Sequence, residues 1–150
     1  MATSIPGQAF IGLAAVAWAD GSLRPSEGKA LIHAATQCGL TGDELAAVEQ
    51  ATKASVSMDG FSAEGLSPWD RVLTYALASW LARLDGVVST DESESLAKLG
   101  EALALDKPVR ARASAAAFDI SLLPEGGRPD KYDFVKLEAR LREKLPQLAK

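Results

Sequence analysis

Two short acidic segments hold the residues of this chain that are best suited to chemistry. In each, an Asp-Gly pair is followed by a glutamate seven positions after the aspartate, and the second segment lies 65 positions after the first. Carboxylate oxygens are preferred ligands of Ca²⁺ and Mg²⁺, which take six or more oxygens, so backbone carbonyls and water would complete the shell. We therefore expect a divalent-cation site whose protein ligands are Asp20, Glu27, Asp85 and Glu92.

The same four carboxylates also suit a structural role. Residues 20–27 are named here the first acidic corner, and residues 85–92 the second. Their glutamates fall near the third position of an expected helix, where a carboxylate satisfies free backbone N–H groups and suits the helix dipole. Their aspartates are placed to accept from backbone amides across a turn. Capping and cation binding both stay open, because a capping carboxylate can offer its second oxygen to a ligand.

The other reactive residue types form no catalytic pattern. Neither corner has the alternating acids of an EF-hand loop, although Asp91 and Glu94 are further carboxylates at the second corner. His33 and Cys38 are each the only residue of their type, which is too few for a structural zinc site. Because the motifs of hydrolases, phosphate-binding loops and zinc proteases are absent, we expect no catalytic residues. The alternative is a metal-dependent enzyme, or an enzyme subunit, that uses the corner carboxylates.

The elements that position these residues are expected to be helices. The chain has 150 residues, of which 47% are hydrophobic, and no stretch alternates β-branched residues as a strand would. Apolar residues at helical spacing predict an all-α fold of about seven helices. The expected ranges are 10–20, 25–38, 41–52, 67–85, 89–103, 106–117 and 130–145, with 67–85 the longest.

Several helix boundaries carry recognisable signals. Gly21 can take the left-handed conformation that ends a helix, and Pro25 suits the first turn of the next one. Thr41 and Glu44 have the form of a capping box, in which the threonine hydroxyl accepts from a backbone amide and the glutamate reaches back. Ser67 and the following proline indicate the start of the fourth helix, and the residues before it, 55–66, are expected to connect two halves of the protein.

The two corners belong to a longer internal duplication. At the same 65-residue offset, apolar residues match along the chain: Ala17 with Ala82, Leu31 with Leu96, Leu40 with Leu105, Phe10 with Tyr75, and Cys38 with Leu103. We expect two pseudo-symmetric helical repeats in residues 1–124 and a C-terminal loop and amphipathic helix in 125–150, packed on the same domain. Because Cys38 matches a leucine, we expect it to be a buried small hydrophobe and not a reactive thiol.

Charge and composition narrow the class of protein. Residues 1–100 carry 6 Lys or Arg against 12 Asp or Glu, whereas residues 101–150 carry 10 against 8. The small C-terminal excess is too weak for a nucleic-acid-binding protein, so we expect protein partners instead. The apolar run 10–19 is preceded by no Lys or Arg, unlike a signal peptide, and no run is long enough to span a bilayer. A lone cysteine favours a reducing, cytoplasmic location.

The corner motifs resemble those of the TerB-like family of tellurite-resistance proteins. The matching segments are Ala17-Trp18-Ala19-Asp20-Gly21 followed by Glu27, and Ala82-Arg83-Leu84-Asp85-Gly86 followed by Glu92. The resemblance covers most of residues 8–120. It implies a duplicated helical fold, a cytoplasmic location in a bacterium and no catalytic activity. It also implies that the acidic residues bind metal and that the protein acts in stress-response or membrane-associated complexes. The two acidic corners would then bind a divalent cation, a basic protein partner, or both.

Overall fold

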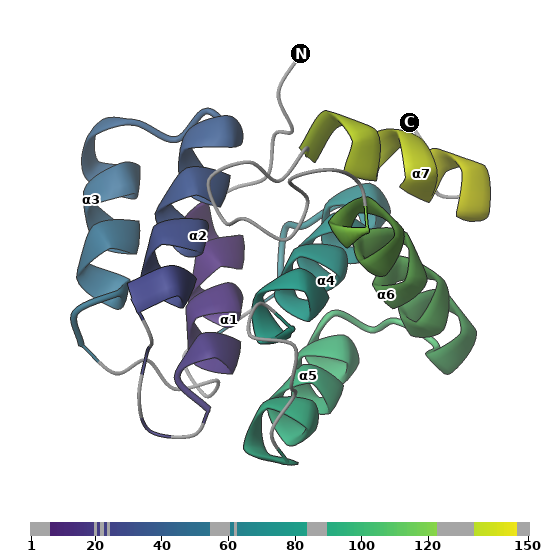
Figure 1. Ribbon diagram of the computed structural model, residues 1–150, viewed down its shortest axis with the longest axis horizontal. Helices are drawn as coiled ribbons and strands as arrows, with labels where there is room; N and C mark the ends of the chain where they lie inside the picture. The colour runs from purple at the N-terminus through teal and green to yellow at the C-terminus, as the bar shows by residue number, and fades with distance from the viewer. Residues whose placement is uncertain are drawn as a thin grey trace.

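The fold is all-α, as the sequence predicts. The computed structural model describes residues 7–19, 21, 23, 25–54, 61, 63–83, 90–122 and 134–146, and these ranges contain seven helices and no strand (Figure 1). The helices are α1 (Gly7–Ala17), α2 (Pro25–Gln37), α3 (Gly42–Ala51), α4 (Pro68–Ala82), α5 (Thr90–Ala102), α6 (Lys107–Ser121) and α7 (Phe134–Lys144).

Helix α4 forms the centre of the protein. Trp69 and every residue from 72 to 82 are buried, so the helix is covered on all sides and not only along the expected apolar stripe. Helices α6 and α1 pack most closely against it, and α5 and α2 also contact it. Its buried hydroxyls have partners: Thr74 donates to the Asp70 carbonyl at 2.7 Å, and Ser79 shares a 2.8 Å hydrogen bond with Ser114. Burial of α4 therefore leaves these polar groups satisfied.

The expected helix starts are confirmed more closely than the expected ends. Helix α2 begins at Pro25, and the Ser67 hydroxyl caps α4 by accepting from the Asp70 backbone at 3.1 Å. Helix α1 ends at Ala17, three residues before the predicted end. The expectation that the fourth helix is the longest was wrong, because α4 and α6 both have 15 residues.

The capping box predicted before α3 was wrong. Thr41 occupies the N-cap position with an extended backbone, but its hydroxyl accepts no hydrogen bond from the helix. Gly42, the first residue of α3, has a φ of 59°, outside the region of a regular first helical turn. The unusual backbone of Gly42 therefore accompanies the missing hydrogen bond between the Thr41 hydroxyl and the first turn of α3.

The helices repeat the 65-residue offset found in the sequence. Helices α1 and α4 end at equivalent positions, α2 and α5 begin and end at equivalent positions, and α3 and α6 begin at equivalent positions. Most matched apolar pairs are also buried in both copies, although Leu96 is only half-buried where Leu31 is fully buried. The two halves of residues 7–122 are thus built on one helical plan.

The turn after the second helix of each copy repeats in atomic detail. After α2, Gly39 has a φ of 84° and the Leu40 amide donates back to the Ala35 carbonyl at 3.1 Å. After α5, Ala104 has a φ of 59° and the Leu105 amide donates to the Gly100 carbonyl at 3.0 Å. Both are Schellman motifs, which end a helix through one left-handed residue. Ala104 carries in this position a Cβ that glycine lacks.

The two copies diverge after this turn. Helix α3 returns along α2, whereas α6 leaves α5 and packs against α4 and α7 (Figure 1). Leu137, Leu141 and Leu145 on the inner side of α7 are fully buried. The Arg142 guanidinium of α7 lies 5.4 Å from the centre of the Trp69 ring on α4. Helix α7 therefore covers α6 and the start of α4, which belong to the second copy.

Replacing Ala104 with glycine should stabilise the protein. A left-handed conformation costs an alanine about 1–2 kcal/mol, which glycine does not pay. Glycine loses a part of this gain because its unfolded chain has more conformational entropy. We expect Ala104→Gly to raise the free energy of unfolding by about 0.5–1 kcal/mol, and the equivalent Gly39→Ala to lower it by about 1 kcal/mol. Urea denaturation of both variants measures this, and a loss of stability in Ala104→Gly would contradict it.

Candidate functional site

Both corner glutamates occupy the helix position that the sequence predicts. Glu27 is the third residue of α2 and Glu92 the third residue of α5, and their exposed fractions are only 4% and 2%. Asp20 and Asp85, the other two expected ligands, lie outside the described residues. The structure therefore describes one carboxylate of each corner, and both face the interior.

Burial of these carboxylates was not predicted. Charges are costly to bury unless they have partners, and both side chains interact with other groups of the protein as well as standing at the positive end of a helix. Glu27 and Glu92 are the two buried acidic residues among those described, and they stand at equivalent positions of the two copies. A buried carboxylate at both equivalent positions points to a common structural or ligand-binding role.

The first corner is anchored to helices α1, α2 and α3. The Gly21 backbone has a φ of 89°, as predicted, and its amide donates to the Trp18 carbonyl at 2.8 Å. The Trp18 indole donates to the carbonyl of Ala51, at the end of α3, at 2.7 Å. Leu23 lies beside Gly28, where an added Cβ would be 3.6 Å from its side chain. These contacts fix the chain on both sides of Asp20.

The second corner carries more negative charge at its helix. Asp91 and Glu94 are exposed on α5, on either side of the buried Glu92. The corresponding part of α2 has an exposed Lys29 near Glu27. The exposed acids can therefore meet a partner at the second corner, whereas the first corner offers a mixed surface.

The described residues contain no ready-made metal centre. No group of three or more His, Cys, Asp or Glu side chains that could hold a metal occurs among them, a set that lacks Asp20 and Asp85. Cys38 is buried, as its match with Leu103 predicts. His33, the single histidine of the chain, is half-buried.

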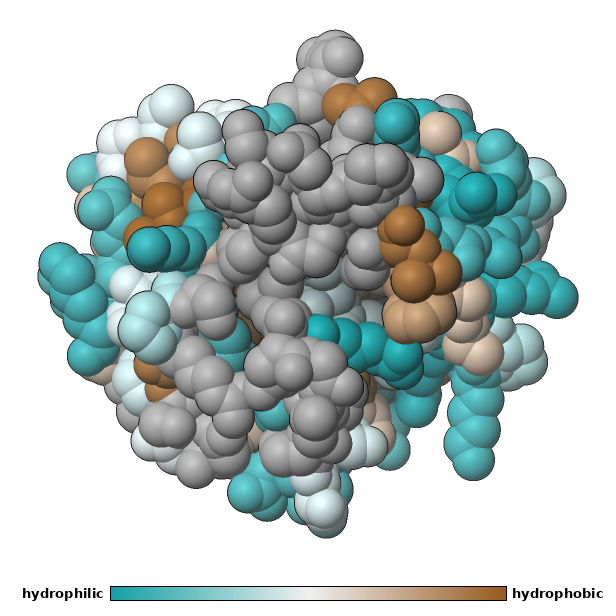
Figure 2. Space-filling view, viewed as in Figure 1, coloured by the Kyte–Doolittle hydropathy of each residue, from teal (hydrophilic) through white to brown (hydrophobic). Residues whose placement is uncertain are grey.

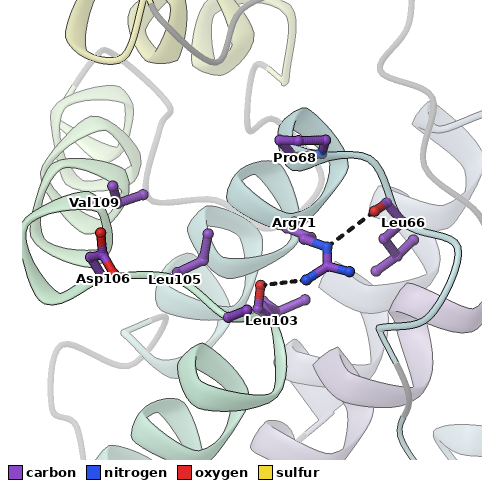
Figure 3. A pocket seen from close by; sticks show the side chains of 8 residues that line it. Leu66, Pro68, Arg71, Leu103, Leu105, Asp106 and Val109 are labelled. Atoms are coloured by element: carbon purple, nitrogen blue, oxygen red, sulfur yellow. Dashed lines mark hydrogen bonds between the residues drawn. The ribbon is translucent and has the colours of Figure 1, made fainter.

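A second candidate site, which the sequence did not suggest, is a cleft between the start of α4 and the turn joining α5 to α6. Its volume is about 340 Å³ (Figure 3). Apolar side chains provide most of its walls, and two charged residues take part. The residues that define it are Leu66, Arg71, Leu103, Leu105, Asp106 and Val109.

Arg71 holds the elements around this cleft together. Its Nε donates to the Leu66 carbonyl at 3.1 Å, and its Nη1 to the Leu103 carbonyl at 3.0 Å (Figure 3). Its Nη2 donates to the Ala63 carbonyl at 3.3 Å. The side chain thus joins the segment before α4 to the C-terminal end of α5, where the negative end of the helix favours a cation.

Only a weak sequence signal marks this cleft. Arg71 is the single charged residue between positions 71 and 82, an otherwise apolar or hydroxyl-bearing stretch. A half-buried charge in such a stretch needs partners, but the acceptors of Arg71 are backbone carbonyls that no side-chain pattern reveals. The cleft could therefore be found only from the tertiary structure.

Hydrophobic side chains of the described residues lie apart from one another on the face shown in Figure 2. Among the coloured atoms of that view they form small separate patches between hydrophilic ones. Phe118, Leu122 and Val135 are the exposed large hydrophobic residues of the described ranges. None of the described helices is both long and apolar enough to cross a membrane.

Comparisons with known proteins found no match for this chain. No family model, curated protein or solved structure matches it. The resemblance to the TerB-like family therefore stays a prediction that rests on the two corner motifs.

Removing the buried corner glutamate should cost more stability than removing an exposed neighbour on the same helix. We expect Glu92→Ala to lower the free energy of unfolding by about 1–2 kcal/mol, because it removes a carboxylate from the first turn of α5 and leaves a void. Glu94→Ala, the matched control, should change it by less than about 0.5 kcal/mol. Urea denaturation in a chelating buffer compares the two, and equal losses would show that burial of Glu92 contributes nothing.

Proposed function

We propose that this protein is a non-catalytic interaction module whose two acidic corners each bind a divalent cation, Ca²⁺ or Mg²⁺. One observation supports the proposal above all others. A buried glutamate recurs at the third position of two equivalent helices, as Glu27 and as Glu92. In each corner the glutamate and the preceding aspartate, Asp20 or Asp85, supply the carboxylates, and backbone oxygens and water complete the shell.

Burial at both equivalent positions distinguishes these glutamates from ordinary caps. An exposed carboxylate serves equally well at a helix N-terminus, where the interaction is worth about 0.3–1 kcal/mol. Glu27 and Glu92 are instead almost fully covered and already interact with other groups of the protein. A divalent cation beside them adds a partner of opposite charge in both copies.

Burial also separates the cation site from the protein-binding surface. A lysine or arginine of a partner needs an accessible carboxylate, and Glu27 and Glu92 are almost completely covered. The exposed Asp91 and Glu94 provide such carboxylates next to the second corner. A basic partner surface therefore docks at the second corner, with the cation ordering the turn beneath it.

The resemblance of the corner motifs to the TerB-like family supports a cellular setting for the module. The setting proposed is the bacterial cytoplasm, in a stress-response or membrane-associated complex. The alternative is a metal-dependent enzyme that uses the same carboxylates. Catalytic metal sites keep a coordination position open to substrate, and the burial of Glu27 and Glu92 favours closed sites instead.

Calorimetry of the chelator-stripped protein with Ca²⁺ and Mg²⁺ tests the proposal. We expect saturable binding that Asp20→Asn/Asp85→Asn abolishes while the circular dichroism spectrum stays helical. A cation at one hundred times its Kd should also raise the free energy of unfolding by about 2.7 kcal/mol per site. The matched control is Asp43→Asn/Glu44→Gln, which removes two exposed acids from the first turn of α3.

Two results would contradict cation binding at the corners. One is the absence of both binding heat and thermal stabilisation, which would leave the carboxylates as caps. The other is an equal loss of binding in the α3 control, which would show diffuse attraction to an acidic surface. Metal-dependent hydrolytic turnover would favour the enzyme alternative.

A further inference from the structure

We propose that the cleft at Arg71 binds a monocarboxylic acid with a short apolar chain. The carboxylate pairs with the Arg71 guanidinium, and the chain lies against the walls formed by Leu66, Leu105 and Val109. This site is separate from the acidic corners. Glu92 and Leu103 lie at opposite ends of α5, about 16 Å apart along the helix axis.

The cleft has the size and lining of a small-molecule site. Its volume of about 340 Å³ lies at the lower end of the range for ligand pockets, which are mostly apolar with a few placed polar groups. Leu66, Leu103 and Leu105 are buried, so their side chains give a fixed wall. Such a cleft suits a chain of several carbons and excludes large ligands.

Arg71 presents a fixed cation to this cleft. A guanidinium has five N–H donors, and three of those of Arg71 are used on backbone carbonyls. Two N–H groups remain, and no carboxylate of the described residues forms an ion pair with the side chain. Because the three carbonyls already hold the side chain, a ligand carboxylate meets an ordered partner and loses little entropy on binding.

Asp106 explains why one carboxylate fits and two do not. It lies on the α6 side of the cleft, across Leu105 from Arg71 in Figure 3, and its side chain makes no capping hydrogen bond. A second anionic group on the ligand would face this carboxylate. Repulsion there orients a monocarboxylate toward Arg71 and disfavours a dicarboxylate of the same length.

The duplication shows that this cleft is particular to the second copy. At the 65-residue offset, Arg71 corresponds to Pro6 and Val109 to Glu44, so the first copy lacks equivalents of the cation and of the Val109 side chain. Ala104, which also lines the cleft, corresponds to Gly39. Its methyl group extends the apolar wall despite the strain of a φ of 59°. The strained alanine is therefore explained by ligand contact.

Titration of the full chain with hexanoate, followed by ¹H–¹⁵N correlation NMR, tests the proposal. We expect saturable shifts of the Arg71 Nε–H and of the amides of residues 103–107 and Val109. Hexan-1-ol, which lacks the charge, and adipate, which has a second carboxylate, should each bind about tenfold more weakly. Ala104→Gly should weaken hexanoate binding about threefold, through loss of one methyl contact, while it stabilises the fold.

Two variants separate ligand binding from folding. Val109→Trp fills the cleft from α6 without removing a hydrogen bond of Arg71, and it should abolish hexanoate binding in a folded protein. Arg71→Lys keeps the charge but loses the fork of donors, and it should bind hexanoate at least about tenfold more weakly. Unchanged binding in Val109→Trp, or equal affinity for hexanoate and hexan-1-ol, would overturn the proposal. So would the absence of saturable shifts.

Discussion

The complete burial of α4 is the constraint on which the rest of the structure depends. From position 72 to position 82 every side chain is inside, so the remaining helices must cover this one element from all directions. Small residues such as Ala76 and Ala78 allow close approach of α1 and α6. Arg71 stands at the one end of α4 where a charge can reach backbone carbonyls, and it closes the structure there.

The two copies of the duplication share their helix order but pack against different neighbouring helices. Both copies keep the bounds of their second helix, the same Schellman turn and the same buried glutamate. In the second copy α6 packs on α4 and α7, and Arg110 fills the space that a larger residue at Gly100 would need, since an added Cβ there would lie 2.5 Å from its Nε. The first copy has Ala35 and Leu45 at these positions. Divergence at the turn accompanies the cleft that lies beside the second copy's turn.

The sequence predicts elements governed by local chemistry. Pro25 and Ser67 mark the helix starts because a fixed φ and a capping hydroxyl act within one turn. The end of α1 was predicted too late, since beyond Ala17 the chain turns and Trp18 bonds to the distant Ala51 carbonyl. The register of Glu27 and Glu92 was predicted, but their burial depends on how the helices pack. The Arg71 cleft was missed because its acceptors are backbone groups from separate segments.

The most direct test of the two cation sites is a ¹H–¹⁵N NMR titration of the chelator-stripped protein with Ca²⁺ and then Mg²⁺. Two equivalent corner sites predict saturable shifts of the Gly21 and Gly86 amides, with the amides of residues 103–107 and Val109 unaffected. Shifts confined to the exposed acids of α3, or no saturable shift at either glycine, would contradict cation binding at the corners.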